Sequence, residues 1–151
     1  MKKAFIPVLS ALLLLMAGCS HTSTTSGPGS WTFAGTTYTS QVSAENASTN
    51  SIFFTADTNT TNNRLLFQFP TFPPVAGNYT PVPPSTILPS AGTCFFQISA
   101  SFGQSSWVSD GLNSSNVVVT VSPTGKISIS ASKLEVDSSP PTFITNVNVS
   151  Q

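Results

Sequence analysis

Hydrophobic and polar residues alternate in short runs through most of the chain after residue 30. A period of two is typical of β-strands with one buried face, because successive side chains of a strand point to opposite faces. The clearest runs have their apolar positions at Cys94, Phe96, Ile98, Ala100 and Phe102, at Val117, Val119 and Val121, and at Ile127, Ile129 and Ala131. No window shows the 3.6-residue period of an amphipathic helix. The pattern predicts an all-β chain.

Weaker runs predict further strands. We expect a hairpin across 34–37, strands over 51–57 and 65–69, and a last strand over 143–149 with Phe143, Thr145, Val147 and Val149 on one face. After Ala131 the apolar positions change parity, which predicts a one-residue bulge near Ser132. In total, about eight to nine short strands predict a single antiparallel β-sandwich or flattened barrel.

Residues 70–89 contain seven prolines. Proline removes a backbone donor, so this density excludes a helix or a central strand. We expect an extended loop with one strand-like piece at 75–79. The loop is either a cover for a sheet edge, which we favour, or a recognition surface.

The N-terminus carries Lys2 and Lys3 before an apolar run over 4–15 that is too short to span a bilayer. Ala17-Gly18-Cys19 follows and resembles the bacterial lipobox, with Met16 where the motif prefers leucine. The resemblance implies a lipoprotein signal peptide at 1–18 and a Cys19 that carries acyl chains such as palmitate. The alternative is an ordinary signal peptide with an incidental cysteine.

The lipidated cysteine begins a polar segment, 19–30, that we interpret as a flexible tether. The all-β domain then covers 31–151. More than one acyl chain anchors a protein stably, so we expect contact with the membrane through the N-terminus and a location in the cell envelope. We expect the outer membrane; the sequence leaves open which face carries the domain.

Charged residues make up only 7 % of the chain. After residue 18, three basic side chains stand against five acidic ones (Arg64, Lys126 and Lys133; Glu45, Asp57, Asp110, Glu135 and Asp137), a net charge of −2. No basic surface is predicted, which argues against nucleic acid as a partner. Each acid lies in or beside an expected loop or turn, where carboxylates serve solubility. We therefore expect no catalytic pair.

Histidine and cysteine are too few for common catalytic or metal sites. His21, the single histidine, lies in the tether, and Cys94 is the one cysteine left after Cys19. The domain therefore has no Ser-His-Asp triad, zinc ligand set or disulfide. We expect no enzyme, no cofactor and no metal, with Cys94 as a buried, unreactive thiol.

Several short motifs occur in a characteristic order: Trp31-x-Phe33-x-Gly35-Thr36-x-Tyr38, Gly77-x-Tyr79, Val117–Val121 and Gly125–Ile129, closed by 143–149. This order is similar to a family of small lipoproteins that is common in Bacteroidota and assigned to domains of unknown function. The resemblance covers residues 31–149 and implies the fold and the location. The chain departs from it at 132–135, where many members have an aromatic-rich strand. It brings no catalytic residues.

The leading functional hypothesis is a monomeric, non-enzymatic binding or envelope-scaffolding module. Its candidate surface consists of Phe95, Trp107 and Tyr79, with Phe53, because the alternation places them on the face opposite the core. Exposed aromatic rings beside hydroxyl and amide groups suit a glycan or an envelope protein. In the alternative, the proline-rich segment covers this face.

A second hypothesis is a carrier of small hydrophobic ligands. In it the strands close into a barrel around a cavity lined by Phe54, Phe67, Phe69 and Phe96. An enzyme that uses carboxylates alone ranks third.

Overall fold

A computed structural model describes residues 29–58, 61–85, 87–100 and 105–151. The expected signal peptide, Cys19, most of the expected tether and Phe102 lie outside these residues. The described chain forms eleven strands and one short 3-10 helix, η1 (Ala47–Thr49). The strands are β1 (Ser30–Phe33), β2 (Thr36–Thr39), β3 (Val42–Asn46), β4 (Ser51–Thr58), β5 (Thr61–Gln68), β6 (Gly77–Pro81), β7 (Thr93–Ala100), β8 (Ser105–Val108), β9 (Val117–Val121), β10 (Ile127–Val136) and β11 (Thr142–Ser150). No helix in this part of the protein is long and apolar enough to cross a membrane.

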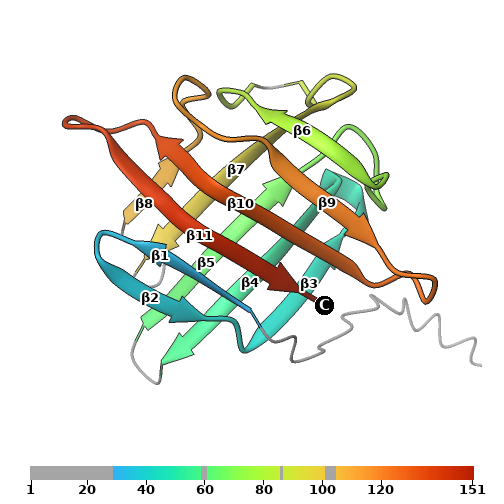
Figure 1. Cartoon of the computed structure of the whole chain (residues 1–151), viewed down its shortest axis with the longest axis horizontal. Coiled ribbons are helices and arrows are strands. Elements are labelled where there is room, and N and C mark those ends of the chain that lie inside the picture. The colour runs from blue at the N-terminus through green and yellow to red at the C-terminus, as the bar shows by residue number, and fades with distance from the viewer. Residues whose placement is uncertain (1–28, 59–60, 86, 101–104) are drawn as a thin grey trace, which may run out of the picture.

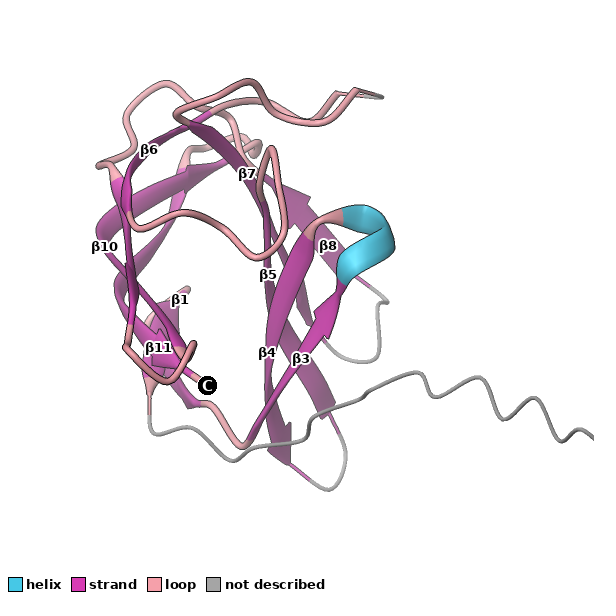
Figure 2. Cartoon of the chain, turned by 90° about the vertical axis from the view of Figure 1, so that its right-hand side faces the viewer, coloured by secondary structure: helices cyan, strands magenta, loops and turns pink. Residues whose placement is uncertain are grey.

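The strands form one continuous sheet that folds back on itself into two facing layers (Figures 1 and 2). One layer runs β2-β1-β11-β10-β9-β6, and the other runs β7-β5-β4-β3, with β8 beside β7. Neighbouring strands are antiparallel except β6 and β7, which are parallel where the two layers join. The sheet is not closed into a barrel, because β2 and β3 remain the two ends of its path. The predicted all-β fold is confirmed in its sandwich form, with more strands than the sequence pattern indicates.

The core fills the space between the layers with the inward side chains of both. Phe54, Phe67, Phe69 and Phe96 are fully buried, and the ring centroid of Phe67 lies 6.4 Å from those of Phe69 and Phe96. Trp31 of the other layer is also fully buried. Burying a large apolar side chain contributes roughly 1.5–3 kcal/mol, so each of these five residues stabilises the fold substantially. The four phenylalanines that would line a carrier cavity have no accessible surface.

The proline-rich segment contributes a strand inside the sheet, so its expected exclusion from a central position is wrong. β6 lies between β9 and β7 and ends at Pro81, which is paired with Cys94. The amide groups of Thr80 and Val82 donate to Gly92 O and Cys94 O of the β7 side, each at 2.9 Å. Amide groups alternate in direction along a strand, so an amide at 81 would point toward β9. The pairing with β9 ends at Tyr79, so no acceptor of β9 faces position 81. A proline, which lacks a backbone N–H, is therefore tolerated at this position.

The change of parity in β10 occurs without the predicted bulge at Ser132. β10 and β11 keep one register on both sides of this position, with Ala131 opposite Val147 and Lys133 opposite Thr145. The inward-facing and outward-facing positions therefore exchange at the same level in both strands, at Ser132 in β10 and at Asn146 in β11. Asn146 has a φ of 53°. A register shift is present instead between β1 and β11, between Ser30 and Thr32.

This reversal also corrects the predicted facing of the last strand. Ile144, Val147 and Val149 are buried, whereas Phe143 is half-buried on the outer face. A simple period of two cannot place these residues, because one left-handed residue inverts the alternation.

Asn146 offers a test of this geometry because it is exposed and touches no core. Asn146→Val should lower the free energy of unfolding by about 1–3 kcal/mol, since a β-branched side chain is strained at positive φ. Asn146→Gly, the control, accepts this φ and should change stability by less than about 1 kcal/mol. Urea unfolding of both variants measures the difference. A valine variant as stable as the wild type would show that β11 does not need a left-handed residue.

Candidate functional site

The outer face of the β3-β4-β5-β7 layer carries three half-buried apolar side chains, Phe53, Leu66 and Phe95. Each follows or precedes a fully buried residue of the same strand, so alternation turns it outward. The register places Phe53 opposite Leu66, and Phe95 opposite Gln68. The register of the neighbouring strands therefore brings these three side chains onto one surface.

A first hollow of about 350 Å³ lies over this surface. Its floor is apolar and its rim is polar; the lining consists of Phe53, Leu66 and Phe95 with Asn46, Thr49, Ser51, Arg64, Gln68 and Gln97. The guanidinium carbon of Arg64 lies 4.4 Å from the ring centroid of Phe53. Gln68 Nε2 donates to Thr49 O at 2.8 Å, which orients the Gln68 amide. The hollow thus combines stacking surface with oriented side-chain amides.

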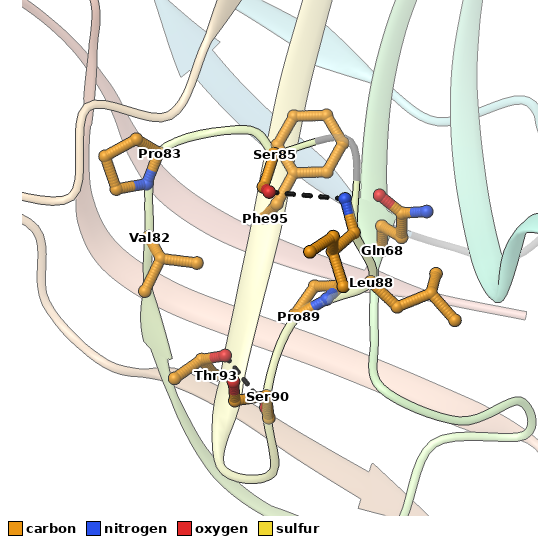
Figure 3. Close-up of a pocket in the computed structure, with 10 residues that line it drawn as sticks. Gln68, Val82, Pro83, Ser85, Leu88, Pro89, Ser90, Thr93 and Phe95 are labelled. Atoms are coloured by element: carbon orange, nitrogen blue, oxygen red, sulfur yellow. Dashed lines mark hydrogen bonds between the residues drawn. The ribbon is translucent and has the colours of Figure 1, made fainter.

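A second hollow of about 360 Å³ lies between β7 and the proline-rich segment (Figure 3). Its walls are mainly apolar, and its lining consists of Gln68, Val82, Pro83, Ser85, Ile87, Leu88, Pro89, Ser90, Thr93 and Phe95. Figure 3 shows Pro83 on one side of the Phe95 ring and Leu88 with Gln68 on the other. Phe95 and Gln68 line both hollows. We name the two hollows together the Phe95 groove.

The wall of the groove is attached to the body of the sheet by Ser109, which is fully buried. Its hydroxyl donates to Val82 O, and its amide donates to Phe96 O at 2.9 Å. Gly111, at a φ of 83°, packs against the same segment, since a Cβ there would lie 2.9 Å from Pro83 Cδ. These contacts hold residues 82–83 beside β7. The proline-rich segment therefore forms one wall of a groove, besides supplying β6.

Two of the three predicted surface residues do not belong to this site. Tyr79 is 7 % exposed and lies in the core, where its ring centroid is 5.0 Å from that of Phe69 and its hydroxyl donates to Val75 O at 2.7 Å. Trp107 is half-buried against the core, opposite Ile98 and 4.9 Å from the Phe33 ring. The expectation that both lie opposite the core is wrong. Phe95 lies on the outer face as expected.

The polar lining of the groove was not predicted from the sequence. Arg64 and Gln68 occupy the outward positions that alternate with the buried Leu65 and Phe67, and this alternation was the available signal. Their proximity to Phe95 depends on the register of β5 against β7, which no local pattern reveals.

The carboxylate of Glu135 contradicts the expectation that each acid is an exposed, solubilising group. Glu135 is 3 % exposed within β10, and its Oε2 accepts hydrogen bonds from the backbone N and the Nδ2 of Asn113 at 2.7 and 2.8 Å. This acid fastens the segment between β8 and β9 to the sheet. In the described part of the chain, no group of three or more His, Cys, Asp and Glu residues is placed to hold a metal ion.

Comparison of the chain with protein-family models, with curated proteins and with solved structures found no match.

Cys94 is fully buried on the inner face with Phe96 and Ile98, as predicted. It has no disulfide partner among the described residues. Burial raises the pKa of the Cys94 thiol to about 12 from 9.0, because the charged thiolate would lose its hydration. The thiol is therefore neutral at physiological pH and unsuited to nucleophilic chemistry.

This raised pKa predicts a loss of stability in alkaline solution. Above about pH 9 the thiol of the unfolded chain ionises while that of the folded protein keeps its proton, until the pH passes about 12. In that range the free energy of unfolding should fall by up to about 1.4 kcal/mol per pH unit from this group. Below about pH 9 the contribution of Cys94 to the free energy of unfolding is constant.

Urea unfolding of the wild type and of Cys94→Ala across this pH range isolates the effect, because the two proteins differ in this thiol alone. We expect the alanine variant to decline less steeply. Rapid reaction of the Cys94 thiol of the folded wild type with a labelling reagent near neutral pH would contradict the burial of Cys94.

Proposed function

We propose that the protein is an exported, lipid-anchored, non-enzymatic binding or scaffolding module that holds its ligand in the Phe95 groove. The observation that carries this proposal is the meeting of two hollows at one half-buried aromatic ring on the outer face of a sheet. Exposed apolar surface of this kind, bordered by polar groups, is typical of a binding site.

The groove is built on a stiff floor. β4 pairs with β3 and β5, and β7 pairs with β5 and β8, so the strands beneath the lining side chains are held on both sides. A site formed in advance loses little conformational entropy when a ligand binds. The filled interior between the layers argues for this outer surface as the site and against a carrier cavity.

Anchoring is supported by the N-terminal signal and by the way the chain enters the domain. Gly29 lies against β11, where a Cβ would come within 2.5 Å of Asn148 O, and its carbonyl accepts from Ser40 N at 2.8 Å. The domain is thus fixed from the residue at which we expect the tether to end. This entry point lies at the end of the domain opposite the loops that follow β6 (Figures 1 and 2). An anchored domain would hold the proline-rich wall of the groove away from the membrane.

Replacing Cys19 tests the anchor. Cys19→Ala should move the protein from the membrane fraction to the soluble fraction of the envelope, because no acyl chain can be attached. Cys94→Ala is the matched control, since it removes the other cysteine of the chain and should leave the protein in the membrane fraction. Unchanged membrane retention of the Cys19 variant would contradict lipid anchoring.

Replacing Phe95 tests the site. We expect envelope extract to shift the NMR signals of the Gln68 and Gln97 side-chain amides in the mature chain that carries Cys19→Ala. Phe95→Ala should weaken this effect at least about tenfold, since a stacking surface of more than about 1.4 kcal/mol is lost. Phe143→Ala is the control, because Phe143 is another half-buried outward ring, with Lys133 Nζ 3.9 Å from its centroid on the opposite layer. Equal losses in both variants would place the site elsewhere.

A further inference from the structure

We infer that the ligand of the Phe95 groove is an unbranched, neutral glycan that crosses the outer face of β4, β5 and β7 with one sugar ring stacked on Phe95. This inference rests on the proposed function, because it names the ligand of the same site.

The shape of the groove requires a chain-like ligand. The two hollows have similar volumes, about 350 and 360 Å³, and share Phe95 and Gln68. Each volume lies near the lower limit of the volumes of small-molecule sites. A compact ligand would therefore occupy one hollow and leave the other empty. A linear polymer places consecutive units in both and passes over Phe95 between them.

The lining has the chemistry that sugar rings require. A pyranose with equatorial hydroxyls presents apolar C–H faces and a polar edge, and it stacks on an aromatic ring while its hydroxyls form hydrogen bonds at the side. Phe95, Phe53 and Leu66 supply the apolar floor. Around them lie amides and hydroxyls, which both donate and accept as sugar hydroxyls do. Gln68 lines both hollows, Gln97 lines the first, and Ser90 and Thr93 line the second.

Charge favours a neutral polymer. Among the described residues that line the groove, Arg64 alone carries a charge, and its guanidinium lies over the Phe53 ring. A polyanion is held by several basic side chains whose contacts weaken strongly with salt. The groove does not provide such a set, and the net charge of −2 after residue 18 would repel a polyanion at long range.

The position of the groove argues against a peptide that binds as an added strand. Such a peptide pairs with a sheet edge, where backbone donors and acceptors are free. The floor strands are interior, since β4, β5 and β7 each pair on both sides. Their backbone groups are used in the ladders, so recognition depends on side chains that stack and on amides, as in sugar binding.

Calorimetry of the mature chain with Cys19→Ala tests the inference with a panel of linear oligosaccharides. The panel holds neutral β-linked glucose, xylose, mannose and N-acetylglucosamine oligomers, an oligogalacturonate and a proline-rich peptide. We expect at least one neutral oligomer to bind, with affinity that rises with chain length until both hollows are filled. Its affinity should be the same in low and high salt. Phe95→Ala should reduce the affinity at least tenfold, and Phe143→Ala should leave it unchanged.

Gln97→Ala provides a second variant if Phe95→Ala does not fold, and it should weaken binding several-fold. Binding of the peptide or of the oligogalacturonate alone would overturn the neutral glycan. If this binding shifts the NMR signals of the Gln68 and Gln97 side-chain amides, the proposed site stays intact. Glycan binding that Phe143→Ala abolishes and Phe95→Ala does not would overturn the site itself. No binding across the panel would overturn the glycan assignment.

Discussion

The structure depends on burying the apolar inner faces of two layers against each other. Phe67 and Phe96 lie on adjacent strands of one layer, and Trp31 comes from the other layer, all without exposed surface. Neither layer could remain folded alone with such residues in water, because apolar burial is the main force that offsets the entropy of the chain. The same constraint determines the outer face. Phe95 stands between the buried Cys94 and Phe96, so it has to point outward.

The join between the layers shapes the candidate site. β6 is the short strand through which the path of the sheet passes from β9 to β7, and the chain continues from it into the wall of the groove. Ser109, buried beside β7, binds Val82 in that wall. The element that closes one side of the fold therefore also shapes the hollow beside Phe95. Prolines suit this place because they stiffen a wall that has few ladder bonds of its own.

Two buried groups, the Cys94 thiol and the Glu135 carboxylate, serve the architecture. The Cys94 thiol is neutral and enclosed, and the Glu135 carboxylate is bound to Asn113. What the surface of the β3-β4-β5-β7 layer offers is an aromatic floor with amides around it. Such a surface suits binding by ring stacking and by side-chain hydrogen bonds, and this is the physical basis of the proposed role.

The sequence by itself determined the fold class, most strand positions and the inward direction of residues such as Phe54 and Cys94. These follow from local alternation, which is a property of each strand alone. Only the tertiary structure decided which strands are neighbours, and so brought Gln68 and the proline-rich wall to Phe95. It also placed Tyr79 and Trp107 inside, because short strands have too few positions to set their own facing. The inversion at Asn146 is of the same kind: it depends on the pairing of β11 with β1 and β10, and register is a contact between distant segments.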